Sequence, residues 1–324
     1  MFHLILLLIA CGTSKENDTS ESPSPASEPS EPTSEPTSEA TSEPSTDPSL
    51  EASVDLEPQP LELVAGVQDY ILTQVVDDEL IERPVFIHTP PAFDANANYP
   101  VLFVFHGNGS NEPNDIAQSS VPQHAEMVDS GAYIGVYPQG YLNSWNLGQE
   151  LSNADDVAFI SHIVAQLTLT EGINSNRIFA SGFSNGAGLT QHLAVQTDLF
   201  QAVAPMATAL VVGNEPTSET PIRSILQIHG TSDDICPYEG GPDNPTGHNF
   251  YSSEQSIALW AEHNGCDPTP TTTTTSEGNT KMYYENCTGG VEVIQLSITN
   301  GEHGFPPQTE GGLNSFVWNF LNAQ

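Results

Sequence analysis

Residues Arg177–Gly188 read RIFASGFSNGAG, and this stretch decides the fold. Arg177–Ala180 is an apolar strand pattern that leads into residues 182–186, GFSNG, which match Gly-x-Ser-x-Gly. That motif is typical of a sharp turn between a buried strand and a helix, where the serine is raised above the end of a sheet. The glycines are needed because the tight turn leaves no room for side chains. The stretch therefore predicts a strand, a turn and a helix, with Ser184 as a nucleophile.

The segments around this turn predict a sheet that is mostly parallel. Its other strands are expected at Tyr70–Val76, Pro84–His88, Val101–Phe105, Tyr133–Tyr137, Ala202–Met206, Ile225–His229 and Val291–Ile298. Most are continuous apolar runs, which indicate burial on both faces by helices. Apolar residues at helical spacing in 157–167 and in Leu313–Leu321 predict two of those helices. The fold class is therefore α/β, with a mostly parallel central sheet and helices on both faces.

A serine hydroxyl is a weak nucleophile, so it needs a histidine, and that histidine needs a carboxylate. In α/β-hydrolases these residues follow in the order serine, acid, histidine. The strand Ile225–Gly230 is followed by Asp233 and Asp234, which leaves two candidates for the acid. His303 follows the last strand, and no other histidine lies beyond it. We expect Ser184, one of the two aspartates and His303 to form a catalytic triad.

Several strings occur in an order that resembles one family. They are FVFHGNG, YPQG, DDVAFI, RIFASGFSNGAG, IHGTSDDICPY, WAEHNGC and NGEHGFPP. Together they resemble the poly(3-hydroxybutyrate) depolymerase and feruloyl esterase group, related to carbohydrate esterase family one, of the α/β-hydrolase superfamily. The resemblance covers residues 80–320 and implies an α/β-hydrolase fold. In the family pattern the acid stands three residues after a His-Gly pair, which implies Asp233.

The roles and positions of further residues indicate how substrate is bound. The main-chain N–H groups of Asn108 and Asn185 are expected to form the oxyanion hole. Trp145 follows a strand end, where it either stacks on an aromatic or sugar group or packs at the rim. His106 and His229 each precede a glycine at a strand end and are expected to be structural or to support the site, with His106 a candidate for substrate contact.

Two departures from the family pattern concern this region. The family often has a cysteine where this chain has Asn108, which leaves an oxyanion hole of backbone N–H groups intact. It often has a glycine-rich run and a tryptophan around the histidine, where this chain has Glu302 and Phe305. Because of the second departure, the resemblance does not specify which residues line the acyl or leaving-group pocket.

Four cysteines allow three complete pairings. If Cys11 carries a lipid, an exported chain is expected to hold one disulfide and one free thiol. The resemblance implies that Cys266 and Cys287 form the disulfide, on either side of an insert with Thr271–Thr275. Cys236 is then the remaining thiol.

The first 60 residues carry signals of export rather than of a fold. Residues 1–11, MFHLILLLIAC, are apolar but too short to span a bilayer, which favours a signal peptide. Their end resembles the lipobox of bacterial lipoproteins, with Cys11 lipidated; an ordinary secretory signal is the alternative. Residues 12–60 are rich in Ser, Thr, Pro and Glu and are expected to be a disordered linker. Residues 61–324 are expected to form the catalytic domain of an envelope lipoprotein or secreted protein.

The charge of the chain limits its partners. Lys and Arg number 5 against 42 Asp and Glu, for a formal net charge of −37. Nucleic acid requires a basic footprint, so it is not expected as a partner. A membrane is expected only through the lipidated N-terminus, and the expected partner is a small or polymeric ester. The mechanism requires no metal and no cofactor.

The resemblance implies a serine carboxylic-ester hydrolase acting on feruloyl or acetyl esters of polysaccharides, or on short hydroxyalkanoate esters. One alternative is an extracellular depolymerase of polyhydroxybutyrate or aromatic polyester. From other classes, a peptidase on the same fold and a non-catalytic surface-binding lipoprotein are the alternatives.

Overall fold

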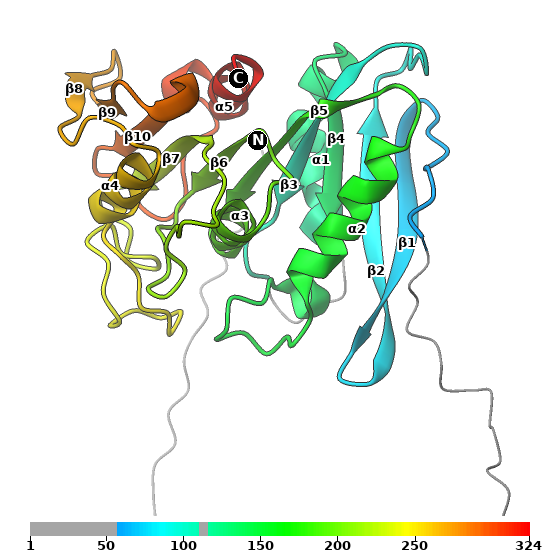
Figure 1. Ribbon diagram of the computed structural model, residues 1–324, viewed down its shortest axis with the longest axis horizontal. Helices are drawn as coiled ribbons and strands as arrows, with labels where there is room; N and C mark the ends of the chain where they lie inside the picture. The colour runs from blue at the N-terminus through cyan, green and yellow to red at the C-terminus, as the bar shows by residue number, and fades with distance from the viewer. Residues whose placement is uncertain (1–56, 110–115) are drawn as a thin grey trace, which may run out of the picture. The chain divides into compact units, whose positions relative to one another are not determined.

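The computed structural model describes residues 57–109 and 116–324. Ten strands in this part form one sheet, in the order β1-β2-β4-β3-β5-β6-β7-β10-β9-β8 (Figure 1). The strands are β1 (Gly66–Val76), β2 (Glu79–Thr89), β3 (Tyr99–Phe105), β4 (Ile134–Pro138), β5 (Ile173–Phe183), β6 (Ala202–Met206), β7 (Ser224–Gly230), β8 (Thr271–Thr274), β9 (Thr280–Tyr284) and β10 (Val293–Ile298). The six central strands from β4 to β10 are parallel. The predicted fold class, a mostly parallel sheet of the α/β type, is confirmed.

Five α-helices in the described residues cover the two faces of the sheet (Figure 1). They are α1 (Ile116–Asp129), α2 (Asp156–Thr168), α3 (Asn185–Gln196), α4 (Ser253–His263) and α5 (Leu313–Asn322). Phe159 of α2, Leu189 of α3 and Ile257 of α4 belong to one buried cluster. Val128 of α1 and Trp318 of α5 belong to the other. The sheet therefore has helices on both faces, and none of the described helices is long and apolar enough to cross a membrane.

Three of the central strands are buried along their whole length, as their apolar sequences predict. Every residue of β4, β7 and β10 is buried. Parallel strands place all their carboxyl ends at one edge of the sheet, and ligands bind at that edge in open α/β sheets. The turns that follow β3, β5, β7 and β10 therefore lie where a site is expected.

The two ends of the sheet are antiparallel hairpins. The hairpin β1–β2 contains the two predicted N-terminal strands, and it is longer than the sequence pattern indicates. At the other end, β8 and β9 form a hairpin that pairs with β10 through β9. This second hairpin was predicted only as a threonine-containing insert, because the exposed strand TTTT has no apolar residue to indicate a sheet.

A buried ion pair joins one end of the sheet to a helix and a loop. Arg83 Nη2 of β2 lies 2.7 Å from Asp156 Oδ1 of α2, and both side chains are at most 2% exposed. The other oxygen of Asp156 accepts a hydrogen bond from the main-chain N–H of Asn146 at 2.7 Å. The pair thereby fixes the start of the loop that runs from Asn146 to α2.

The predicted signal peptide, Cys11 and all but the last residues of the predicted linker lie outside the described residues. Residues 57–60, at the end of that linker, have no regular secondary structure. The proposed division at residue 61 stays a prediction.

Candidate active site

Ser184 lies in the turn between β5 and α3, with φ 55° and ψ −122°. Such positive-φ backbone is strained for a residue other than glycine and concentrates at functional sites. A Cβ on Gly182 would lie 2.2 Å from the carbonyl oxygen of Gly186, and a Cβ on Gly186 would lie 2.3 Å from that of Phe105. Both glycines of the motif are therefore required by close backbone contact, as the sequence predicts.

The turns after three strands bring a serine, a histidine and an aspartate together. His303 Nε2 lies 2.8 Å from Ser184 Oγ, and His303 Nδ1 lies 2.9 Å from Asp233 Oδ2. Asp234, the other candidate acid, is exposed. This chain of hydrogen bonds lets His303 accept the proton of Ser184 while Asp233 fixes the ring.

Asp233 is held by more than His303. Its Oδ1 accepts hydrogen bonds from the main-chain N–H groups of Ile235 at 3.0 Å and Cys236 at 2.9 Å. His229 Nε2 lies 3.2 Å from Oδ2, and both of these side chains are fully buried. Burial alone would raise the pKa of Asp233, but the hydrogen bonds from His229 and His303 outweigh it and lower the pKa well below its usual range. Asp233 therefore stays ionised at neutral pH.

The sequence predicts a structural or supporting role for His229, and the structure gives this residue a specific contact. Its Nε2 is 2.8 Å from the carbonyl oxygen of Cys236, so this nitrogen donates and its proton is shared with Asp233. The sequence signal was the His-Gly pair at the end of β7, four residues before the acid. The imidazole of His229 thus contacts the same carboxylate oxygen, Oδ2, as His303.

The loop that carries His303 depends on a glycine and on the β8–β9 hairpin. A Cβ on Gly230 would lie 2.4 Å from the carbonyl oxygen of Gly301, so the end of β7 must be glycine for the loop to pack there. Farther on, Glu310 Oε1 accepts hydrogen bonds from Thr275 Oγ1 at 2.6 Å and Asn279 Nδ2 at 2.8 Å. Glu277 in turn accepts the main-chain N–H of Glu310 at 2.8 Å. The hairpin therefore braces the segment after His303.

The main-chain N–H groups assigned to the oxyanion hole flank Ser184. Asn185 is the first residue of α3, and the first N–H groups of a helix have no partner within it. A Cβ on Gly107 would lie 3.3 Å from Ser184 Cβ, which places the chain before Asn108 against the serine. Asn108 itself is exposed. The assignment of both N–H groups to an oxyanion hole stays a prediction.

Comparison with known proteins finds esterases. Residues 149–249 match the family model described as phospholipase/carboxylesterase. The chain is 29% identical to feruloyl esterase B of Piromyces equi over 68% of its own length, and it spans only 42% of that protein. It is 28% identical to a probable feruloyl esterase C of Aspergillus niger, over 74% of this chain and 84% of that protein.

Solved structures show the fold. The acetyl xylan esterase of Aspergillus awamori superposes with a TM-score of 0.54 at 14% identity, over 78% of this chain and 99% of that one. A thermostable esterase gives a TM-score of 0.53 at 17% identity, over 79% of this chain and 63% of that one. The chain therefore has an α/β-hydrolase fold, and its sequence is similar to feruloyl esterases.

Trp145 has no exposed surface for a substrate. Of its two predicted roles, stacking on substrate is wrong because the side chain is fully buried, with 0% exposure. Its Nε1 donates to the carbonyl oxygen of His106 at 2.9 Å, and its ring packs edge-on against Phe105. Trp145 therefore fills the core beneath the site.

His106 makes structural contacts within the protein, and it also lines a hollow beside Phe183. Its Nδ1 lies 2.7 Å from the carbonyl oxygen of Gly107, and its Nε2 accepts the main-chain N–H of Gly140 at 2.9 Å. Both ring nitrogens are thus used within the protein. Burial lowers the pKa of His106 to about 4, so the ring is neutral at pH 7. His106 ties β3 to the turn after β4.

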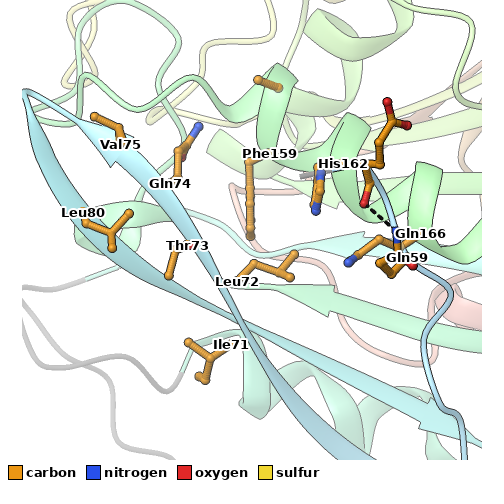
Figure 2. Close-up of a pocket in the computed structure, with 12 residues that line it drawn as sticks. Gln59, Ile71, Leu72, Thr73, Gln74, Val75, Leu80, Phe159, His162 and Gln166 are labelled. Atoms are coloured by element: carbon orange, nitrogen blue, oxygen red, sulfur yellow. Dashed lines mark hydrogen bonds between the residues drawn. The ribbon is translucent and has the colours of Figure 1, made fainter. Parts of the chain in front are cut away.

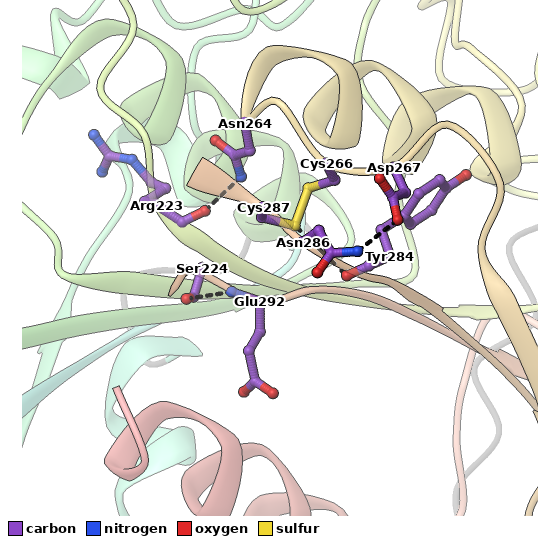
Figure 3. Close-up of a disulfide and its surroundings, with 9 residues drawn as sticks. All are labelled: Arg223, Ser224, Asn264, Cys266, Asp267, Tyr284, Asn286, Cys287 and Glu292. Carbon is purple, nitrogen blue, oxygen red and sulfur yellow. Dashed lines mark hydrogen bonds between the residues drawn. A yellow bond between two sulfur atoms is a disulfide. The ribbon is translucent and has the colours of Figure 1, made fainter. Parts of the chain in front are cut away.

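The cysteines occupy two different environments. Cys266 and Cys287 form a disulfide at the base of the β8–β9 hairpin (Figure 3), the pairing that the resemblance implied. Cys236 is a buried free thiol beside the hydroxyl groups of Thr208 and Ser184. Burial raises the pKa of Cys236 to about 12. The thiol therefore stays neutral and is not a competing nucleophile.

An apolar groove of about 650 Å³ adjoins the turn of Ser184, between α1 and α5. Its apolar lining includes Val104, Ile116, Phe183, Met206, Phe305 and Leu313. The ring of Phe183 lies 5.3 Å from that of His303 and 6.1 Å from that of Phe305. Phe305, one of the departures from the family pattern, is therefore a wall of this groove.

A second hollow, of about 430 Å³, lies between β1 and α2 (Figure 2). Leu72, Phe159 and His162 are among its lining residues, and none of the predicted site residues lines it. The described residues contain no cluster of three or more His, Cys, Asp or Glu side chains that could hold a metal ion.

Proposed function

We propose that this chain is a serine carboxylic-ester hydrolase that acts on feruloyl or acetyl esters of polysaccharides, with short hydroxyalkanoate esters as further substrates. The observation that carries the proposal is the continuous set of hydrogen bonds from Ser184 through His303 to Asp233. The names of the similar proteins, feruloyl esterases and an acetyl xylan esterase, support the choice of substrate.

The proposed reaction follows from these contacts. His303 accepts the proton of Ser184 Oγ as the oxygen attacks the ester carbonyl, and Asp233 stabilises the imidazolium. The N–H groups of Asn108 and Asn185 bind the oxyanion. His303 then protonates the leaving alcohol, and it activates a water molecule that hydrolyses the acyl-enzyme.

The groove beside Phe183 supports an aromatic acyl group. Its volume of about 650 Å³ lies within the usual range of small-molecule sites, about 300–1,000 Å³. Much of its lining is apolar, and Ser119, Gln123 and Asn314 supply polar atoms. A phenolic ring fits this combination, and an acetyl group leaves the groove empty.

Export is part of the proposal. A disulfide such as Cys266–Cys287 persists in oxidising compartments, which supports an exported protein. The lipobox-like sequence that ends at Cys11 supports a lipid anchor in the cell envelope. Metabolic labelling with a clickable fatty acid tests this: the wild type is expected to be labelled, and Cys11→Ala is not.

The activity is tested by labelling and by a substrate panel. A fluorophosphonate is expected to label the wild type and not Ser184→Ala. Methyl ferulate, acetylated xylan, a hydroxybutyrate oligomer and matched amides are then compared by kcat/KM. Preference for the amides would favour a peptidase, and preference for the solid polymer would favour a depolymerase. A protein that neither reacts nor turns over any ester would be a binding protein.

The acyl groove is tested with Leu313→Trp, which places a large side chain in it. We expect kcat/KM for methyl ferulate to fall at least about tenfold relative to that for an acetyl ester, because only the aromatic group needs the space. Leu169→Trp is the matched control, since Leu169 is exposed at the end of α2. Equal losses on both esters would contradict the assignment of the groove.

A further inference from the structure

A second pair of a histidine and a carboxylate lies near Ser184, outside the proposed triad. His248 Nε2 lies 2.9 Å from Glu150 Oε1, and the two side chains are 5% and 9% exposed. Glu150 belongs to the loop before α2, and His248 belongs to the loop before α4. No motif in the sequence connects the two residues, which are 98 positions apart.

Glu150 also contacts the residue that follows the nucleophile. Its Oε1 accepts a hydrogen bond from Asn185 Nδ2 at 2.9 Å, and its Oε2 accepts the main-chain N–H of Leu147 at 2.7 Å. Burial alone would raise the pKa of Glu150, but the hydrogen bonds from His248 and Leu147 outweigh it and lower the pKa. The carboxylate is therefore ionised, and it is held in one place by donors from three segments.

The side chain of Asn185 has all its partners in the loop that Glu150 shapes. Its Oδ1 accepts the main-chain N–H of Trp145 at 2.7 Å, and its Nδ2 donates to the carbonyl oxygen of Trp145 at 2.9 Å as well as to Glu150. A side chain bound in this way cannot rotate without breaking several hydrogen bonds. The first residue of α3 is thereby fixed to the loop.

Fixing this residue matters because of the backbone beside it. Ser184 has a positive φ, and such strained backbone persists only where the surrounding structure holds it. A hydrogen-bond donor for a developing oxyanion must lie within about 0.5 Å of its productive position. Whatever holds Asn185 therefore also sets the position of the N–H that the reaction uses.

We propose that Glu150, held by His248, is a positioning residue for the oxyanion hole. It orients the side chain of Asn185 and, through it, the main-chain N–H at the start of α3. The inference rests on the proposed function, since it assigns a role to that N–H in ester hydrolysis. It predicts an effect on the transition state and little effect on substrate binding.

The experiment uses the full chain with Glu150→Leu, Glu150→Gln and His248→Gln. Glu150→Leu is expected to lower kcat for methyl ferulate about 10²-fold and to change KM less than about threefold, as expected of a misplaced donor. The rate of fluorophosphonate labelling of Ser184 should fall by a similar factor, because the phosphoryl oxygen occupies the same hole. Glu150→Gln should keep part of the activity, since an amide oxygen still accepts from Asn185.

The matched control is His88→Gln. His88 is a buried histidine whose Nε2 lies 3.2 Å from Asp129 Oδ1, between β2 and α1, and it does not contact Asn185. We expect this variant to keep kcat within about twofold of the wild type. Thermal unfolding of each variant, followed by circular dichroism, separates loss of fold from loss of position.

The outcomes are distinct. A folded Glu150→Leu variant with unchanged kcat overturns the inference, and so does a loss confined to KM. Losses in kcat that merely match those of His88→Gln overturn it as well. If Glu150→Leu does not fold, Glu150→Gln and His248→Gln decide, and unchanged kcat in both again overturns the inference. If the wild type hydrolyses no ester and takes no label, the proposed function itself fails, and this inference fails with it.

Discussion

Asp233 and Glu150 are two buried carboxylates near the same serine, and each binds a histidine from another loop. Both have a lowered pKa, so charge alone does not distinguish them. The difference lies in the next partner. His303 continues from Asp233 to Ser184 Oγ at 2.8 Å, whereas the second side-chain partner of Glu150 is Asn185, at 2.9 Å. The same pair of groups can move a proton in one place and hold a backbone in another.

The two sides are also braced differently. On the Asp233 side, the chain after His303 is held by the β8–β9 hairpin, with the disulfide Cys266–Cys287 at its base (Figure 3). On the Glu150 side, the loop is held by the buried ion pair of Arg83 and Asp156, through the N–H of Asn146. One brace is covalent and the other is electrostatic.

The largest effect is expected from removal of the proposed nucleophile or base. Ser184→Ala and His303→Ala should each lower kcat about 10⁵-fold or more, because these two groups act as a unit. Steady-state kinetics on methyl ferulate measures the loss, with circular dichroism as the check on folding. His248→Gln is the comparison, and a loss as large as that of His303→Ala would erase the distinction between the two pairs.

A smaller loss is expected from the acid. Asp233→Asn should lower kcat about 10³- to 10⁴-fold, because an amide no longer stabilises the imidazolium or fixes its tautomer. Asp234→Asn is the matched control, since Asp234 is adjacent but exposed, and its kcat should stay within about twofold. If Asp234→Asn were the more damaging variant, the assignment of the acid would be wrong.

The covalent brace is tested through stability. Replacement of Cys266 and Cys287 by serine should lower the free energy of unfolding by about 3 kcal/mol, the usual value for a loop of this length, with a sequence separation of 21. Urea unfolding with and without reductant gives the change. The wild type should lose the same amount in reductant while the double variant should not respond, and an unchanged midpoint in all cases would show that the hairpin needs no brace.

The smallest expected effect is a loss of stability at low pH, caused by two buried histidines. Burial lowers the pKa of both His106 and His124 to about 4. Below the ordinary value of about 6.5, the unfolded chain gains protons that the folded chain does not, so stability falls as the pH drops from 6.5 to 4. At pH 5 each of the two histidines should lower the free energy of unfolding by about 2 kcal/mol.

Variants separate the two histidines. His124→Gln, on α1, should abolish the contribution of His124 to the pH dependence of the free energy of unfolding. The contribution of His106 should remain. Urea unfolding at pH 7 and pH 5 tests this. Identical pH dependence in wild type and variant would show that His124 is accessible to protons in the folded state.

The sequence predicts the parts of the site that strand ends specify. Ser184, Asp233 and His303 each follow a predicted strand, and parallel strands bring their ends to one edge. The β8–β9 hairpin was not predicted, since exposed threonines give no apolar alternation. Its role in holding the loop after His303 comes from Glu310 and Glu277, whose contacts depend on the fold.

What the sequence does not specify has a common cause. The strand-end position of Trp145 leaves both stacking on substrate and packing open, and only the fold shows that its side chain is buried. Glu150 and His248 were not singled out, because they meet only through two irregular loops. Local patterns specify where a strand stops, but not which way the next side chain points.

The buried thiol of Cys236 has a practical consequence for chemical labelling. Alkylating reagents attack the thiolate, and a pKa of about 12 leaves almost none at neutral pH. Its side chain is also out of reach of bulky reagents, and Cys266 and Cys287 are already joined. Within residues 57–109 and 116–324, a cysteine introduced on the surface would thus be the one site open to a maleimide dye. A fluorophore could then report on the segment after His303 with the native cysteines left in place.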